Sequence, residues 1–270
     1  MVRSSDNGDT WSEAIDISRQ TKLPAVLSQA TGPGIGIRVV AGANKGRILV
    51  PINAVGGPDG WYNYLIYSDN LGESWGVIEG KSQYGTNESQ LVQIGADEFL
   101  INARCHRFIG NENLAPKGWN PWNFGRVTRY RGDIKVSIDG TKGAWNKTRV
   151  RTDMPDPLCQ GGLIRYSGLE NREPSILLFT NPASNLTDQK TKRPYANTPP
   201  MRMNGSIALS SDEGESWSVR KRFYGNRYTE YQYSVPARLE NKKVGVIFEA
   251  NNHIKFAAFD LKWIQSNGVK

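Results

Sequence analysis

The chain has 270 residues, enough for one large domain with a buried core, and its 38 % hydrophobic and 22 % charged residues exclude a disordered or fibrous protein. Two cysteines exclude a disulfide scaffold, and the lack of an apolar run of about 18 residues excludes a transmembrane helix. The net charge of +8 comes from scattered Lys and Arg, which favours a diffusely basic surface over a nucleic-acid partner. A basic cleft for an acidic small substrate explains the sign of the charge equally well.

Short strands bounded by turn residues follow one another along the chain, and no window shows the apolar stripe of a helix. In chain order the predicted strands are 47–50, which runs into Pro51, and then 61–67, 90–94, 99–103, 175–180, 206–209, 244–248 and 254–259. The turn residues at 95–98 and 251–252 predict two hairpins. Many short strands without helices between them indicate a sandwich, a barrel or a propeller.

A turn motif recurs four times and favours the propeller. Residues 4–11 read S-S-D-N-G-D-T-W, and similar runs occupy 68–75, 137–145 and 210–217. The closing residues, Trp11, Trp75, Trp145 and Trp217, lie 64, 70 and 72 residues apart, a spacing typical of repeated β-blades. Asp and Ser side chains can bond the turn's own backbone, and Gly permits its positive φ. Asp6 and Asp212 are therefore expected to be structural rather than catalytic.

This motif resembles the Asp box, or BNR repeat, of the sialidases (neuraminidases), a family of six-bladed β-propellers. Further segments resemble family motifs in the family's order, namely 32–37, 46–51, 87–90, 101–104, 159–164, 202–204, 233–234 and 248–251. The resemblance implies an all-β, sialidase-type β-propeller in which residues 1–270 form a single domain. It also implies blades marked by the four tryptophans.

The resemblance further implies the residues of an active site. Arg104 and Arg202 match two of the three arginines with which the family binds the carboxylate of sialic acid, a task suited to the planar guanidinium. Tyr233 matches the nucleophile, and Glu88 matches the base that activates it. A neutral phenol is not repelled by the substrate's carboxylate, but it needs a base because tyrosine is protonated at neutral pH. Val235–Pro236 departs from the family's usual Asp-Leu at that place.

The implied function is that of an exo-α-sialidase, which removes terminal sialic acid from glycoproteins, glycolipids or oligosaccharides with retention. Sialylated glycans are thus the expected partners. No cofactor is expected, and with two histidines and no Cys/His cluster no metal site is expected either. Residues 106–125 are expected either to overhang the cleft or to form an ordered surface loop. N-x-S/T sequons at 87, 146, 185 and 204 favour a secreted or lysosomal protein.

Other classes stay open. A lectin-like propeller would keep the arginines without turnover, and an Asp-box interaction scaffold would lack a pocket with paired arginines. These motifs do not separate a trans-sialidase from a hydrolase. The family pattern starts with an F/Y-R-I-P segment and an acid/base Asp ahead of the first box, which here begins at Ser4. We therefore expect an incomplete first blade, and we expect residues 1–270 alone to be a poor or inactive enzyme.

Overall fold

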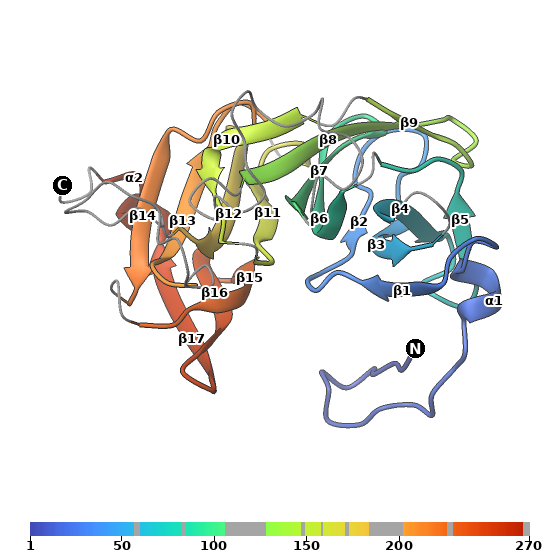
Figure 1. The fold of residues 1–270 in the computed structure, drawn as a ribbon, viewed down its shortest axis with the longest axis horizontal. Helices are drawn as coiled ribbons and strands as arrows, with labels where there is room; N and C mark the ends of the chain where they lie inside the picture. The colour runs from blue at the N-terminus through green and yellow to red at the C-terminus, as the bar shows by residue number, and fades with distance from the viewer. Residues whose placement is uncertain are drawn as a thin grey trace.

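The computed structural model describes residues 1–56, 60–82, 85–105, 128–146, 149–157, 159–170, 173–183, 202–225 and 229–266. These residues form four antiparallel sheets that follow one another along the chain and stand in an arc, as the blades of a propeller do (Figure 1). The predicted all-β, propeller-type fold is confirmed, although the described residues supply four blades rather than six. The predicted loop 106–125 and the sequon at 185 lie outside the described residues.

The strands of each sheet are consecutive in sequence. The first sheet contains β1 (Ser28–Thr31), β2 (Ile37–Arg38), β3 (Ile48–Val55), β4 (Trp61–Ser68) and β5 (Gly76–Ile78). The second contains β6 (Thr86–Gly95), β7 (Glu98–Cys105), β8 (Thr128–Val136), β9 (Gly143–Trp145) and β10 (Arg149–Pro155). The third contains β11 (Gly162–Ser167), β12 (Ile176–Pro182), β13 (Gly205–Ser210) and β14 (Val219–Tyr224), and the fourth contains β15 (Gln232–Arg238), β16 (Lys243–Ala250) and β17 (His253–Asp260).

The helices are short. They are α1 (Ser18–Thr21), ahead of the first sheet, and α2 (Leu261–Gln265), after the last strand. Within the described ranges, neither is long and apolar enough to cross a membrane.

The core lies between neighbouring sheets, because successive residues of one strand face opposite sides. On β6, Leu91 packs in the cluster shared with the first sheet, whereas Val92 packs in the cluster shared with the third. On β12, Leu177 joins that second cluster and Leu178 joins the one shared with the fourth sheet. Middle sheets are thus buried on both faces, which explains why their strands read as nearly continuous apolar runs.

Pro51 does not end its strand, contrary to the prediction from sequence. It lies inside β3, opposite Leu65 of β4. Its carbonyl accepts a hydrogen bond from the Gly32 nitrogen, so its nitrogen also faces the interval between the end of β1 and the start of β2. No ladder bond is lost there, which is why a proline is tolerated within this strand.

Three of the four predicted boxes connect strands of a sheet. They join β4 to β5, β8 to β9 and β13 to β14. The first box adjoins no strand in the described residues, and its Trp11 is 62 % exposed. The expectation that Trp11 marks a blade therefore fails for the described chain. In the other sheets the box joins two consecutive strands on the outer side of the blade. In the described residues of the fourth sheet only one strand, β17, follows β16, so no box occurs there.

The box around Asp212 shows why its acidic residue is structural, as predicted. The Asp212 carboxylate accepts hydrogen bonds from the Ser216 nitrogen at 2.9 Å, the Ser216 hydroxyl at 2.6 Å and the Ser210 hydroxyl at 2.7 Å. Asp6 is held in the same way by its own turn. Asn70 accepts the corresponding bond from the Ser74 nitrogen at 2.9 Å, so the turn does not require a charge.

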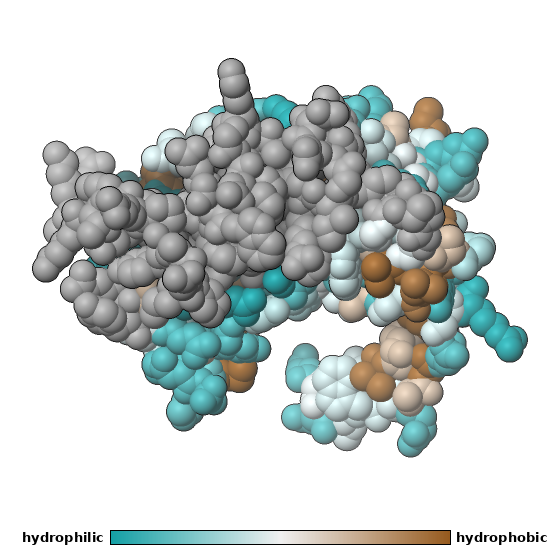
Figure 2. Space-filling view, viewed as in Figure 1, coloured by the Kyte–Doolittle hydropathy of each residue, from teal (hydrophilic) through white to brown (hydrophobic). Residues whose placement is uncertain are grey.

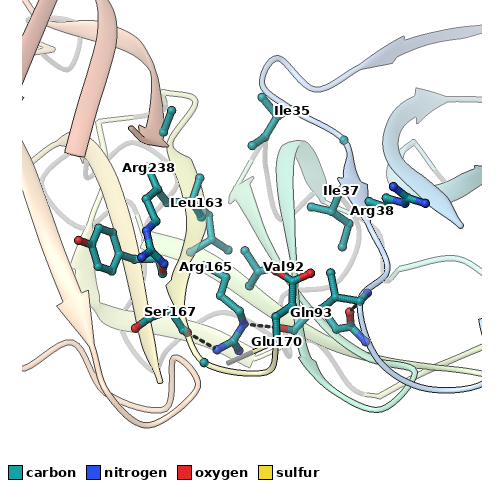
Figure 3. A pocket seen from close by; sticks show the side chains of 16 residues that line it. Ile35, Ile37, Arg38, Val92, Gln93, Leu163, Arg165, Ser167, Glu170 and Arg238 are labelled. Carbon is teal, nitrogen blue, oxygen red and sulfur yellow. Dashed lines mark hydrogen bonds between the residues drawn. The ribbon is translucent and has the colours of Figure 1, made fainter. Parts of the chain in front are cut away.

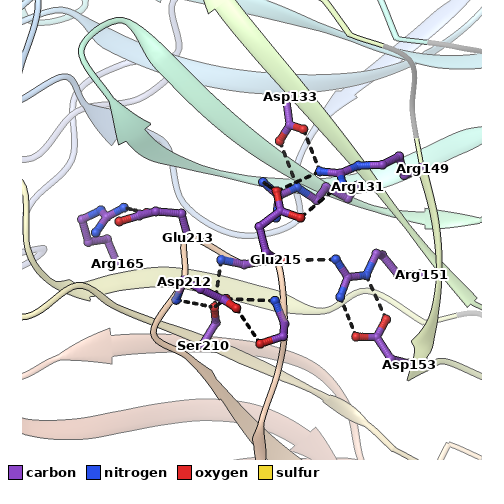
Figure 4. A network of polar contacts seen from close by, with 12 residues as sticks. Arg131, Asp133, Arg149, Arg151, Asp153, Arg165, Ser210, Asp212, Glu213 and Glu215 are labelled. Carbon is purple, nitrogen blue, oxygen red and sulfur yellow. Dashed lines mark hydrogen bonds and ion pairs between the residues drawn. The ribbon is translucent and has the colours of Figure 1, made fainter.

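Ion pairs fasten this box to the second sheet (Figure 4). Glu215 lies 3.0 Å from Arg131 and 3.1 Å from Arg149, both of which belong to the second sheet. On the other side of the box, Glu213 pairs with Arg165 of β11. The turn therefore closes its own hairpin and also joins two blades.

The N-terminal segment shows apolar side chains on its surface, at the lower right of Figure 2. Val2 and Ile15 are among the exposed large apolar residues. Arg3 connects this segment to the second box, where it pairs with Glu73 and donates to the Gly72 carbonyl. On the fourth sheet, Ile247, Ile254 and Phe256 are likewise exposed.

The boxes predict that acid destabilises the fold. Hydrogen bonds from Thr10 and Ser4 hold the pKa of Asp6 at about 2. Burial alone would raise the pKa of Asp212, but the hydrogen bonds from Ser216 outweigh burial, so the pKa of Asp212 lies below its usual range. Because the folded pKa lies below the unfolded one, this stabilisation is present above about pH 4 and is lost as the pH falls towards the folded pKa. Urea unfolding between pH 4 and pH 2 should show a falling free energy of unfolding.

The matched variant for this prediction is Asp212→Asn, which copies the residue found at Asn70. It should keep the turn and show a weaker dependence of stability on pH between pH 4 and pH 2. A variant whose acid dependence equals that of the original chain would show that the boxes are not the source.

Candidate active site

Glu88 and Tyr233 both lie at the start of an inner strand, where the ladder is interrupted. The register of β6 against β7 shifts between Thr86 and Ser89, and the register of β15 against β16 shifts between Gln232 and Ser234. Such β-bulges turn a side chain away from the regular alternation. Tyr233 has a φ of 39°, in the left-handed region that is strained for a residue with a side chain.

The Glu88 carboxylate joins two of the other predicted residues. Its Oε1 accepts a hydrogen bond from the Tyr233 hydroxyl at 2.9 Å, and its Oε2 accepts one from Arg104 Nη1 at 2.8 Å. The side chains of Arg104 and Glu88 are only 16 % and 14 % exposed, which limits screening of this pair by solvent.

Arg202 approaches Tyr233 from the other side. Its guanidinium carbon lies 5.3 Å from the centre of the Tyr233 ring, within the range of a cation–π contact. Its Nη1 donates to the Gln232 side-chain oxygen at 2.6 Å. The structure thus brings all four predicted residues into one continuous set of contacts, with Tyr233 between Glu88 and Arg202.

The surroundings keep the phenol protonated at neutral pH. Burial raises the pKa of Tyr233, and the charge and hydrogen bond of Glu88 raise it further, while Arg202 opposes them. Burial alone would lower the pKa of Arg104, but its bond to Glu88 outweighs burial and the pKa is raised. The arrangement therefore holds a neutral hydroxyl against an acceptor that can take its proton, beside two arginines.

Donor capacity remains on Arg104. Its Nε is buried and has no hydrogen-bond partner within the described residues. An unpaired buried donor is costly, and a ligand carboxylate would satisfy it. Over the same described ranges, no group of three or more His, Cys, Asp or Glu side chains is arranged to hold a metal ion.

The Cys159–Gly162 segment fixes the strand that carries Tyr233. Gln160 accepts a hydrogen bond from the Ser234 nitrogen at 2.9 Å and donates to the Ser234 carbonyl at 3.1 Å. A Cβ at Gly162 would lie 2.2 Å from Pro236 Cδ, so only glycine permits this approach of β11 to β15. The departure at Val235–Pro236 is accommodated by that close packing.

Sequence reasoning missed the residues that support the site. Gln232 holds Arg202, and the Asn63 side chain donates to the Asn87 carbonyl at 2.7 Å beside Glu88. Arg129 of β8 lies opposite Arg104 of β7 in the ladder, and it forms a fully buried ion pair with Asp156. The position of Gln232 next to Tyr233 was the one available signal, and the others depend on contacts between distant segments.

Comparison with known proteins gives consistent matches. The sequence profile of the BNR repeat-like domain matches residues 1–246. The chain is 25 % identical over 267 residues to a sialidase of Micromonospora viridifaciens, covering 98 % of this chain, and 33 % identical over 260 residues to an anhydrosialidase of Macrobdella decora, covering 92 % of it. The solved structure of the Hadza microbial sialidase Hz136 shares the fold, with a TM-score of 0.74 at 24 % identity over 97 % of this chain.

The matched proteins are longer. The chain spans 35 % of the Micromonospora protein, 29 % of the Macrobdella protein and 44 % of Hz136.

Proposed function

This chain belongs to the BNR repeat-like domain family, and from that premise we propose that its site removes terminal α-linked sialic acid from glycoconjugates with retention of configuration. The observation that carries the proposal is the Glu88 carboxylate, which accepts one hydrogen bond from the Tyr233 hydroxyl and another from Arg104. The proposed nucleophile, Tyr233, and the proposed carboxylate-binding group, Arg104, thus each contact the proposed base, Glu88.

Substrate binding rests on the two arginines. Sialic acid carries a carboxylate on its anomeric carbon, and two planar donors lie near Tyr233: Arg202 contacts its ring, and Arg104 binds Glu88, the acceptor of its hydroxyl. The anomeric carbon then lies near the phenol oxygen. A carboxylate nucleophile at this place would be repelled by the substrate's own charge, whereas the phenol is not.

The reaction proceeds in two displacements at the anomeric carbon. The Tyr233 oxygen attacks this carbon while Glu88 takes the phenol proton, and the bond to the leaving oxygen breaks as that oxygen takes a proton from an acid. Water then attacks the glycosyl-tyrosine and gives a proton to the conjugate base of that acid, while the proton on Glu88 returns to the phenol as its oxygen leaves. Two inversions give net retention.

The first test compares two substrates of the 270-residue chain. An aryl α-sialoside has a good leaving group that needs little protonation, whereas sialyllactose requires an acid. Because a positioned acid is worth about 10²–10⁴-fold, we expect the chain to cleave the aryl sialoside at least about 10²-fold faster than sialyllactose. Chromatography of released sialic acid measures both rates.

The outcomes separate the candidate functions. Equal rates on both substrates would contradict the expectation of a poor enzyme and would mean that another group serves as the acid. Binding of sialic acid without turnover of either substrate would favour the lectin-like propeller. Neither binding nor turnover would favour the interaction scaffold.

A second candidate reaction follows from the Macrobdella relative, which is named an anhydrosialidase and is 33 % identical to this chain. In this reaction a hydroxyl group of the bound sugar, rather than water, attacks the glycosyl-tyrosine. The product is then an anhydro sugar, lighter than sialic acid by one water molecule. Mass spectrometry of the released product distinguishes the two reactions, which use the same four residues.

A further inference from the structure

A cavity of about 390 Å³ is lined by residues of β6, β11 and β15 (Figure 3). Its lining includes Gln93 of β6 and Arg238 of β15. Each of these residues is five positions beyond Glu88 or Tyr233 on the same strand, which corresponds to about 16 Å. The cavity is therefore separate from the candidate active site, and its volume falls within the range of small-molecule sites.

The walls of this cavity are aliphatic and come from three sheets. Ile35 and Ile37 lie on one side, and Val92 of β6 and Leu163 of β11 lie on the other (Figure 3). The Ile35 side chain lines the cavity and is 41 % exposed, so part of its apolar surface is open to solvent. Val92 and Leu163 are buried at 2 % and 0 % exposure, so the apolar surface open to a ligand is mainly that of Ile35 and Ile37.

Arg238 supplies a fixed cation at the wall. Its Nη1 donates to the Tyr166 carbonyl at 2.7 Å, and its guanidinium carbon lies 4.8 Å from the centre of the Tyr166 ring. The nearest carboxylate, that of Glu173, is 3.6 Å away and also lies 3.8 Å from Lys242. Glu173 is thus shared between two cations, and the guanidinium keeps donors for a further acceptor.

Cationic side chains outnumber acidic ones in the lining of the cavity. Arg165 is neutralised by Glu213 and also donates to the Gln93 and Ser167 carbonyls. Arg38 and Glu170 also line the cavity, and neither forms an ion pair within the described residues. Among the described residues that line the cavity, three are cationic, namely Arg38, Arg165 and Arg238, and one is acidic, namely Glu170, which favours an anionic ligand.

We propose that this cavity binds a small amphipathic carboxylate, with its aliphatic chain against Ile35 and Ile37 and its carboxylate on Arg238. Guanidinium and carboxylate form charge-assisted hydrogen bonds, and burial of the chain adds a contribution from each methylene. This site is independent of the proposed sialidase activity, and its test measures binding rather than turnover.

Calorimetric titration of the 270-residue chain with hexanoate, octanoate and octan-1-ol tests the proposal. We expect one saturable site for octanoate and an affinity that rises about four-fold for each added methylene. Octan-1-ol, which lacks the charge, should bind at least about ten-fold more weakly than octanoate. Absence of saturable octanoate binding, or equal affinity for the alcohol, would overturn the proposal.

Variants locate the site. Arg238→Gln should weaken octanoate binding about ten-fold or more, and Ile35→Asp, at an exposed position, should weaken both octanoate and the alcohol. Glu170→Gln should strengthen octanoate binding by up to about five-fold, because it removes a like charge from the lining. Arg19→Gln on α1 and Tyr233→Phe in the active site are the controls and should leave binding unchanged.

The variant outcomes are decisive in both directions. Octanoate binding that survives both Arg238→Gln and Ile35→Asp would place the ligand elsewhere and refute this site. If either variant does not fold, as judged by circular dichroism, the other variant and the Glu170→Gln change still decide the location. The chain-length series on the unmodified protein decides the ligand class independently.

Discussion

Replacing Tyr233 by phenylalanine is expected to lower kcat on an aryl α-sialoside by at least about 10³-fold, because the change removes the oxygen that we propose as the nucleophile. Glu88 keeps its contact with Arg104, so the carboxylate-binding arginines stay in place. Binding of sialic acid, followed by saturation-transfer NMR, should therefore change by less than about three-fold. The kinetic loss should lie in kcat and kcat/KM alike.

A matched control and a chemical trap sharpen this test. Tyr224→Phe removes a hydroxyl from another partly buried tyrosine, whose ring packs 4.7 Å from that of Phe248, and it should leave turnover unchanged. A fluorinated sialic acid that slows the second displacement should label Tyr233 in the original chain, and peptide mass mapping locates the label. Labelling of another residue, or undiminished turnover by the phenylalanine variant, would reject Tyr233 as the nucleophile.

Local patterns in the sequence predicted the parts of the fold that depend on neighbouring residues. The hairpin between β6 and β7 and the one between β16 and β17 form as expected, because each combines two apolar strands with a turn of Gly, Asn or Asp. The box turns are likewise local, since their Asp and Ser side chains bond the turn's own backbone.

Contacts between distant segments were outside the reach of such patterns. Pro51 predicted the end of a strand, but β3 continues because β1 and β2 leave an interval beside the proline nitrogen. The Tyr233–Glu88 hydrogen bond joins residues 145 positions apart, and only the resemblance to a known family placed the two together beforehand. Their bulges depend on pairing with β7 and β16, which no local spacing encodes.

Burial of charge was the other feature that the sequence did not reveal. Arginine is seldom fully buried, so residue type alone does not predict that Arg129 lies in the core. In the structure its side chain and that of Asp156 are both 0 % exposed. Full burial arises because the second and third sheets pack face to face over this pair, with Phe179 of β12 5.2 Å from the guanidinium.

Asp156→Ala should destabilise the chain by about 3–5 kcal/mol, the loss typical when one partner of a buried ion pair is removed. Arg129 would keep its bond to the Cys159 carbonyl at 2.7 Å but would become an uncompensated buried charge. The Cys159 nitrogen, which donates to Asp156 at 2.7 Å, would lose its acceptor as well. Urea unfolding followed by tryptophan fluorescence measures the change in the free energy of unfolding.

The control for this prediction is Asp153→Ala, in the strand that leads to Asp156. Asp153 pairs with Arg151 at 2.5 Å but is 48 % exposed, so its loss should cost only about 0.2–1 kcal/mol. Adding Arg129→Met to Asp156→Ala should recover part of the stability, because the unpaired charge is then removed.

Asp156 also holds the segment that carries Gln160, whose two bonds fix Ser234 beside Tyr233. Equal losses for Asp156→Ala and Asp153→Ala would mean that Arg129 finds another partner, and the buried pair would then not be what anchors the strand that carries Tyr233.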